Sequence, residues 1–202
     1  MKKVLFPFIL IISFICCSGQ KPDTIYQKVN PQGRRAFPNN SIYFEFFGHS
    51  MGIGSLNYER VFLHEGDFYL TGRMGIGYTP GKHFKTISFP ILVNGVYQLS
   101  NSFAFECGIG TCISYTFWPD WTEQVWALFW TYDVFHKGGT YFDPLLTGNV
   151  GIRVQLKNGF LFRFGFTPVY NLISISEELV NYSIIPRKVG YWFGISLGYC
   201  FK

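Results

Sequence analysis

Hydrophobic and polar side chains alternate with a period of two residues along eight separate segments of the 202-residue chain. The last segment is the clearest, because large apolar residues at odd positions alternate there with mainly small residues. A β-strand sends successive side chains to opposite faces, so this alternation predicts strands with one apolar face. The predicted strands cover residues 41–48, 55–62, 68–78, 87–99, 103–117, 145–156, 160–167 and 189–201. We expect a bulge at Pro90, because proline cannot donate to a strand ladder.

The connections between the predicted strands alternate in length. Those after the second, fourth and sixth strands are short, and Asn158-Gly159 in one of them accepts the positive φ of a tight hairpin turn. Those after the third, fifth and seventh strands are longer, and the longest covers about residues 118–143. Short turns at one end and longer loops at the other are typical of closed transmembrane barrels. We therefore predict an all-β fold, an eight-stranded antiparallel up-and-down transmembrane β-barrel.

The first 40 residues do not alternate and divide into two segments. Lys2 and Lys3 precede an apolar stretch and small residues near position 19, which together predict a secretory signal peptide over residues 1–19. The apolar stretch is shorter than the roughly 20 residues of a spanning helix, and a lipoprotein anchor at Cys16 or Cys17 is a minor alternative. Residues 20–40 are polar and contain three prolines, so we expect a periplasmic tether before a barrel of residues 41–202.

The composition agrees with a chain that faces lipid. Aromatic residues make up 20% and charged residues 14%, against about 25% charged residues in a typical soluble domain. Loss of Lys2 and Lys3 with the signal peptide lowers the formal charge from +5 to +3. No basic cluster is interleaved with aromatic residues, so we expect no nucleic-acid partner.

Cysteine and histidine positions indicate neither a disulfide framework nor a metal site. The mature chain keeps three cysteines, and strand parity places Cys107 toward lipid and Cys112 and Cys200 toward the inside, so we expect all three to be free. The four histidines lie on different connections without metal-ligand spacing, and we expect no metal and no cofactor. These histidines are His49, His64, His83 and His136.

Short motifs at both ends of the chain resemble a known family. They are residues 40–45 (NSIYFE), 55–60 (SLNYER), 88–91 (SFPI) and 199–201 (YCF). The mature chain resembles the small eight-stranded outer-membrane barrels of the OmpA/OmpX type, and most of all the uncharacterised barrel proteins common in Bacteroidota. Its final aromatics resemble the signal read by the barrel-assembly machinery, although Lys202 follows them. The resemblance implies the outer membrane of a Gram-negative bacterium, with outer-membrane lipid and that machinery as partners. It supplies no catalytic or ligand residues.

The inward-facing positions carry equal numbers of acidic and basic residues. They are Glu45, Glu59, Arg73, Glu106, Arg153 and Arg163. At strand spacings of about 4.8 Å, Arg73 reaches toward Glu59 and Glu45, and Glu106 meets Arg153. Because unpaired buried charges are costly and an eight-stranded interior is narrow, we expect one balanced ionic layer that plugs the lower lumen. A proton or ion path through this layer is the alternative.

The outer part of the inner face is rich in glycine, which leaves two interpretations open. Either tight curvature and large neighbours need the space, or a cavity open to the outside holds a small ligand or an acyl chain. The glycines are Gly75, Gly77, Gly108, Gly110, Gly165, Gly190 and Gly194.

The connection after the fifth strand is the most distinctive external segment, because four tryptophans lie within it. This candidate interaction loop contains Trp118, Trp121, Trp126 and Trp130. We expect Asp120 to cap a short helix over residues 121–130. The rings either lie at the membrane interface, fold over the barrel mouth, or form an adhesive surface for a partner, a glycan or a lipid.

Together these features favour an outer-membrane barrel without enzymatic activity, with a structural role or an interaction role through its external loops. A small transporter or channel and a lipid-modifying enzyme are the alternatives. Such an enzyme needs a histidine with a serine or an acid at the outer rim. His49, Ser50, Asp133 and His136 supply these residue types only.

Overall fold

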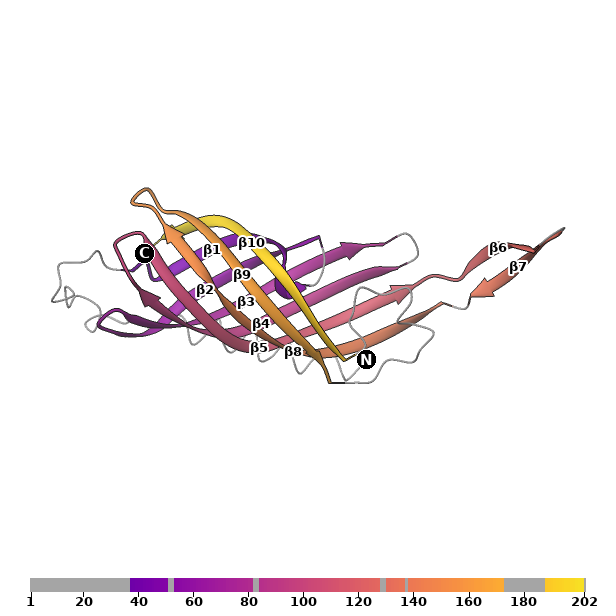
Figure 1. The fold of residues 1–202 in the computed structure, drawn as a ribbon, viewed down its shortest axis with the longest axis horizontal. Coiled ribbons are helices and arrows are strands. Elements are labelled where there is room, and N and C mark those ends of the chain that lie inside the picture. Colours follow the sequence, from indigo (N-terminus) through magenta and orange to yellow (C-terminus); the bar gives the residue numbers. More distant parts are fainter. Residues whose placement is uncertain are drawn as a thin grey trace.

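Eight antiparallel strands close into one barrel in the computed structural model, which describes residues 37–50, 53–81, 84–127, 130–136, 138–172 and 188–201. The barrel strands are β1 (Asn40–Phe47), β2 (Gly54–Glu65), β3 (Phe68–Pro80), β4 (Lys85–Gln98), β5 (Phe103–Trp118), β8 (Gly139–Gln155), β9 (Phe160–Asn171) and β10 (Val189–Phe201). Their order around the barrel is β1-β10-β9-β8-β5-β4-β3-β2 (Figure 1). The predicted all-β, eight-stranded, antiparallel up-and-down barrel is confirmed.

The last strand closes the barrel against the first. β10 has the predicted bounds, and β1 pairs with it from Asn40 opposite Phe201 to Phe47 opposite Gly194. Glu45 lies opposite Ser196, so the charged face of β1 meets a small polar residue of β10. Closure leaves no free edge where these two strands pair, which a barrel in lipid requires.

Two local expectations about β3 and β4 are wrong. The connection between them is not long, because both strands extend until Pro80 pairs with Lys85 and only residues 81–84 are left. Pro90 makes no bulge, since Met74 opposite Ile91 and Gly77 opposite Ser88 keep one register across it. The missing proline N–H interrupts the pairing locally without shifting it. The register of β2 and β3 shifts instead at Phe62.

The expected helix over residues 121–130 is also wrong. These residues begin a second sheet of two strands, β6 (Trp121–Ala127) and β7 (Trp130–His136), which pair only with each other. Bulky aromatic, β-branched and threonine residues favour strands, and the hairpin continues the direction of β5 and β8 beyond the barrel (Figure 1). Asp120 closes the base of this hairpin: its Oδ1 accepts a hydrogen bond from the Gly138 N–H at 2.5 Å.

The outer face of the barrel is apolar and the inner face is polar. Many large apolar side chains at outward positions are between 36% and 71% exposed. One such residue from each barrel strand is Phe44, Leu56, Ile76, Val93, Phe105, Ile152, Phe164 and Leu197. The parity expected for the cysteines is confirmed, because Cys107 is exposed, Cys112 and Cys200 are buried, and all three are free. No helix among the described residues is long and apolar enough to cross a membrane.

Two segments outside the strands fill the ends of the lumen. Left-handed φ angles at Phe47 (59°) and Gly48 (60°) turn the chain inward after β1, into a short 3-10 helix, η1 (Gly48–Ser50), whose three residues are buried. At the opposite end, the buried Phe37 ring stacks on Tyr69 with 4.3 Å between centroids. The predicted signal peptide and most of the predicted tether lie outside the described residues.

Candidate functional site

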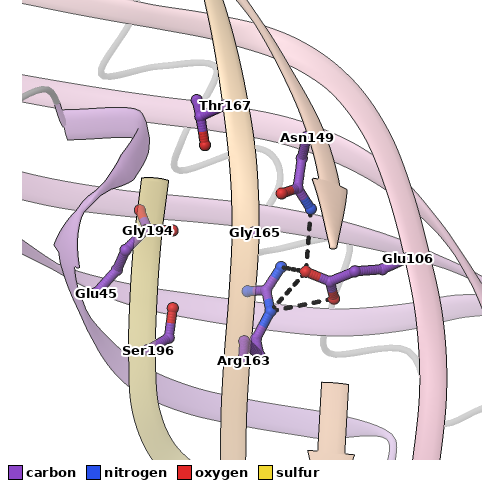
Figure 2. A pocket seen from close by; sticks show the side chains of 8 residues that line it. All are labelled: Glu45, Glu106, Asn149, Arg163, Gly165, Thr167, Gly194 and Ser196. Atoms are coloured by element: carbon purple, nitrogen blue, oxygen red, sulfur yellow. Dashed lines mark hydrogen bonds and ion pairs between the residues drawn. The ribbon is translucent and has the colours of Figure 1, made fainter. Parts of the chain in front are cut away.

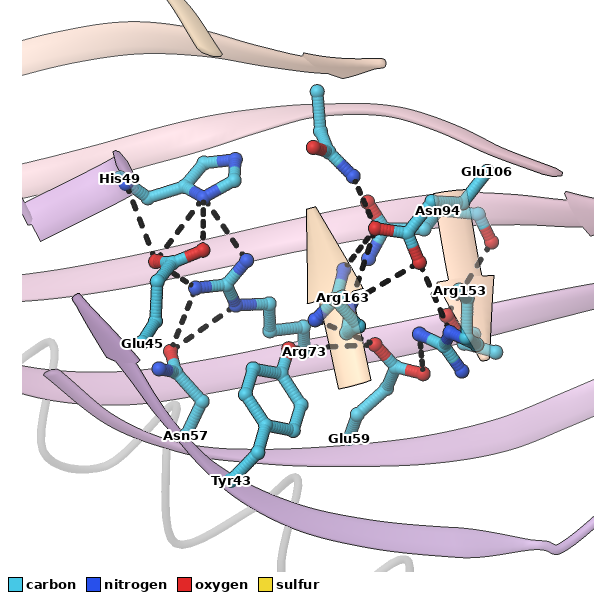
Figure 3. A network of polar contacts seen from close by, with 12 residues as sticks. Tyr43, Glu45, His49, Asn57, Glu59, Arg73, Asn94, Glu106, Arg153 and Arg163 are labelled. Carbon is cyan, nitrogen blue, oxygen red and sulfur yellow. Dashed lines mark hydrogen bonds and ion pairs between the residues drawn. The ribbon is translucent and has the colours of Figure 1, made fainter. Parts of the chain in front are cut away.

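The six charged residues expected inside the barrel lie together at its centre. Each is at most 4% exposed, and each comes from a different strand. They are Glu45 (β1), Glu59 (β2), Arg73 (β3), Glu106 (β5), Arg153 (β8) and Arg163 (β9) (Figure 3). We call this set the ionic layer. Alternation places one inward charge on each of six strands, and closure of the barrel brings the six side chains to one level.

One half of the ionic layer is built around Glu45. Its Oε2 accepts a hydrogen bond from Arg73 Nη2, and it also accepts one from the backbone N–H of His49 at 3.2 Å. The His49 ring is inserted in the same group, with Nδ1 3.2 Å from Glu45 Oε1 and 2.9 Å from Arg73 Nη1. Asn57 Oδ1 accepts further hydrogen bonds from Arg73 Nε at 3.1 Å and Nη2 at 3.0 Å. The guanidinium of Arg73 is therefore held on several sides (Figure 3).

The other half of the ionic layer is built around Glu106. Its Oε1 accepts a hydrogen bond from Arg163 Nη2 at 2.6 Å, and its Oε2 accepts one from Arg153 Nε at 3.0 Å. Arg153 Nη2 donates in turn to Glu59 Oε1 at 2.6 Å, and Arg163 Nη1 lies 3.6 Å from Glu59 Oε2. Asn149 Nδ2 donates to Glu106 Oε1 at 3.0 Å. Two carboxylates and two guanidiniums thus form a closed, charge-balanced group.

Tyr43 joins the two halves and changes the expected pairing. Its hydroxyl donates to Glu59 Oε2 at 3.4 Å, and its ring faces the guanidiniums of Arg163 at 4.6 Å and Arg73 at 5.3 Å. The expected approach of Arg73 to Glu45 and of Arg153 to Glu106 is present. The expected pairing of Arg73 with Glu59 is not found among the described residues, and Glu59 pairs with the two arginines of the other half.

Sequence reasoning missed the two residues that extend the ionic layer toward the ends of the barrel. The sequence predicts His49 on a connection, whereas η1 directs its side chain into the lumen. The four-residue spacing between His49 and Glu45 is the only local sign of their contact. Phe37 was placed in the tether, but its ring lies 5.5 Å from the Arg153 guanidinium. Phe37 also packs in an apolar cluster with Val61, Tyr69, Val96 and Ala104. The only sequence feature that indicates a packing role for Phe37 is its aromatic side chain just before the first strand.

The glycines of the inner face make room for neighbouring side chains. A Cβ on Gly108 would lie 2.0 Å from Asn94 Oδ1, and one on Gly75 would lie 2.2 Å from Asn57 Oδ1. A Cβ on Gly165 would lie 2.8 Å from Asn149 Oδ1. These three glycines therefore support the interpretation in which large neighbours need the space.

The space beside the ionic layer is too narrow to admit a water molecule. It lies next to β9 and β10, and Figure 2 shows the side chains around it. Its lining residues are Glu45, Glu106, Asn149, Arg163, Gly165, Thr167, Gly194 and Ser196.

The tryptophans of the candidate interaction loop lie at the end of β5 and in the two-stranded sheet of β6 and β7. Trp118 ends β5, and its ring lies 5.3 Å from that of Phe84. Trp121 and Trp126 belong to β6, and Trp130 begins β7. We call β6 and β7 the external hairpin.

The residue types considered for an enzyme are divided between two parts of the fold. His49 and Ser50 are buried in η1 inside the lumen, whereas Asp133 and His136 belong to β7 of the external hairpin. His64 is on β2, with Nε2 2.7 Å from the Gly66 carbonyl oxygen, and His83 lies outside the described residues. Within the described residues, no group of three or more histidine, cysteine, aspartate or glutamate residues is arranged to hold a metal ion.

Comparisons with known proteins place no constraint on the function. No model of a protein family matches the chain, and no curated protein is similar to it.

Proposed function

We propose that the protein is an outer-membrane β-barrel of a Gram-negative bacterium, without enzymatic activity, whose lumen is plugged and whose external hairpin serves an interaction role. The observation that carries the proposal is the inverted polarity of the barrel. The six charged residues of the ionic layer are buried inside, while large apolar residues are exposed on all eight barrel strands.

The exposed apolar face supports a membrane environment. Soluble monomers rarely expose a contiguous apolar patch larger than a few hundred Å². An apolar outer band and a polar interior are the arrangement of transmembrane barrels, where lipid covers the band. Closure by β1 and β10 pairs the backbone groups that hydrocarbon would leave unsatisfied.

The ionic layer supports a plug rather than a path for ions or protons. Its three carboxylates and three guanidiniums neutralise each other, which leaves no net charge to attract a permeant ion. Guanidinium groups do not release protons in proteins, so a relay through Arg73, Arg153 or Arg163 would be blocked. η1 on one side and Phe37 on the other add side chains to the same narrow lumen.

The external hairpin supports an interaction role. It extends beyond the barrel, and its two strands pair only with each other among the described residues (Figure 1). Free strand edges are templates for pairing with another chain, and the segment is rich in tryptophan, which is enriched at binding surfaces. Its partner is an external one, separate from the lipid around the barrel.

The family-level part of the proposal follows from the size of the barrel and the motifs in the sequence. Eight strands with short turns at one end agree with a small barrel of the OmpA/OmpX type, most like those of Bacteroidota. The aromatic residues Tyr199 and Phe201 at the end of β10 would serve as the signal for the barrel-assembly machinery.

Cys107 offers a test of the membrane proposal that needs no change to the barrel. It is the exposed cysteine on the outer face, whereas Cys112 and Cys200 are buried. In intact cells we expect a membrane-impermeant maleimide to leave the wild-type protein unlabelled and to label Thr122→Cys, because Thr122 is exposed on β6. After denaturation in hot detergent, both proteins should react. Labelling of wild-type Cys107 in intact cells would refute the membrane placement.

A further inference from the structure

The barrel wall is lower at the seam between β1 and β10 than beside it. β1 ends at Phe47, opposite Gly194, whereas β10 extends five residues farther toward the end that carries the external hairpin. Residues 189–193 of β10 pair with β9 alone among the described residues. On the other side, β2 begins at Gly54, opposite Phe46. We call this gap, with residues 189–193 as its edge and the ends of β1 and β2 as its floor, the seam notch.

The inward turn after β1 produces the seam notch. The left-handed backbone at Phe47 and Gly48 directs the chain into η1 instead of continuing the wall. Gly48 then lies directly behind β10, because a Cβ on Gly194 would be 3.0 Å from Gly48 Cα. The residues of η1 therefore lie inside the lumen and do not extend the barrel wall beyond β1.

Hydrogen bonds near the two ends of β10 show which residues face β9. The Lys188 carbonyl, just before β10, accepts from the Asn171 N–H at 2.8 Å, and the Cys200 N–H donates to the Gly159 carbonyl at 2.7 Å. In an antiparallel pair, alternate residues direct both backbone groups to the same neighbour. Even-numbered residues of β10 thus face β9, and odd-numbered residues face β1 or, beyond its end, the seam notch.

Three residues direct their N–H and C=O groups into the seam notch. They are Val189, Tyr191 and Phe193, and no hydrogen bond to any described residue is found on that side. Pro168 of β9 lies opposite Tyr191. Proline has no N–H to donate, which agrees with the backbone groups of Tyr191 pointing away from β9. The edge of the notch is therefore a short unpaired strand.

The height of β1 places the floor of the seam notch in the upper part of the apolar band. Its eight residues, at about 3.3 Å each and tilted by about 40°, rise about 20 Å along the barrel axis. The apolar band of such barrels is about 25 Å tall, so the edge begins inside the band and rises past its border. Unpaired backbone groups are costly in hydrocarbon, so the lower part of this edge needs a polar partner there.

Exposed apolar side chains and unpaired polar groups lie next to each other at the seam notch. Val189, Tyr191 and Phe193 are 67%, 71% and 58% exposed on the outer face, where lipid tails would lie. Behind the edge, Trp192 faces the lumen, and its Nε1 donor has no hydrogen-bond partner among the described residues. An apolar surface is thus next to unpaired neutral donors and acceptors.

We propose that the seam notch is a lateral binding site for an amphiphilic lipid whose polar part is uncharged and carries amide or hydroxyl groups. The proposal rests on the membrane placement above. The N–H and C=O groups of Val189, Tyr191 and Phe193 pair with the polar part, and the tail packs over their side chains. The N–H and C=O groups of this edge carry no net charge, and the arginines of the ionic layer are already neutralised by carboxylates, so Lys188, just before β10, is the nearest exposed charge on that strand.

Backbone NMR of the refolded full chain tests the proposal through an alternation between neighbours. The barrel is kept in dodecylphosphocholine, which has no hydrogen-bond donor, and titrated with N-octanoyl-N-methylglucamine, which carries an amide and hydroxyls. We expect amide shifts at Val189, Tyr191 and Phe193 and none at Gly190 and Trp192, whose N–H groups face β9. Equal shifts at odd and even positions, or no shift at all, would overturn the proposal.

A single substitution adds a second test. Tyr191→Pro removes a donor that faces the seam notch while keeping the ladder to β9, and it should abolish the shifts at Val189 and Phe193. The matched control Tyr191→Phe keeps the backbone donor and should bind like the wild type. Wild-type binding by Tyr191→Pro would refute the site. If that variant does not fold, the alternation in the wild-type titration still decides. If the NMR titration shows no binding but Cys107 still does not react with maleimide in intact cells, the lipid site is refuted and the membrane placement stands.

Discussion

At the scale of single residues, the ionic layer depends most on Glu106. Its carboxylate accepts hydrogen bonds from Arg153, Arg163 and Asn149, which come from β8 and β9. Removing one partner of a buried ion pair leaves the other charge uncompensated, which destabilises a protein more than replacing both partners by apolar residues. Tyr43 is important in another way, because it joins the two halves of the layer by contacting an arginine of each.

Glu106→Gln should therefore destabilise the barrel strongly. It leaves Glu59 as the one carboxylate beside the two buried guanidiniums of Arg153 and Arg163. Breaking a buried ion pair costs about 3–5 kcal/mol. The free energy of unfolding, measured with urea on protein refolded in lipid vesicles, should fall by about that amount. The control Glu65→Gln, at the exposed end of β2, should change it by less than about 0.5 kcal/mol. Equal losses in the two variants would contradict the role given to Glu106.

At the scale of elements, the external hairpin and η1 differ in what they add to the fold. The strands of the hairpin pair only with each other among the described residues, and the Asp120–Gly138 hydrogen bond closes its base. η1 is buried and packs against β9 and β10 inside the lumen. One element is attached to the barrel, and the other is part of its interior.

Deletion of residues 121–136 should leave the barrel folded. With the hairpin removed, the free energy of unfolding in vesicles should stay within about 0.5 kcal/mol of the wild type, because no barrel strand loses its partner. Folding is followed by the slower gel migration of the protein after boiling in detergent. Deletion of residues 48–50 is the contrasting variant and should destabilise the barrel. A hairpin deletion that fails to fold would show that the hairpin is not independent.

At the scale of the whole molecule, the proposed plug predicts a barrel that does not conduct. The ionic layer is balanced, and the space beside it does not admit a water molecule. Interiors of eight-stranded barrels are just wide enough for side chains to fill.

Purified protein in planar lipid bilayers should therefore show no sustained single-channel step. A wide porin in the same bilayer provides the positive control. A stable, reproducible step from the wild-type protein would contradict the plug and favour the transporter or channel alternative.

Much of the fold was readable from the sequence because strand alternation is local. Residues 189–201 alternate between large and small side chains, and β10 has those bounds. The inward positions of Glu45, Glu106 and Arg153 followed from the same parity. The external hairpin was misread because tryptophans after an aspartate fit a capped helix as well as a strand. The aromatic and β-branched residues of the segment favour strands as well, and in the structure the two strands pair with each other.

The sequence by itself determined which residues face inward, because side-chain parity follows from backbone geometry within one strand. It also determined that the inward charges cancel. The tertiary structure alone decided which charges pair, since closure and register set distances between strands. It placed Tyr43 between Arg73 and Arg163, and His49 beside Glu45. It also produced the seam notch, because β1 ends before β10 does. The contacts of Tyr43 join residues of different strands, whose proximity depends on the closed barrel, and no local pattern encodes them.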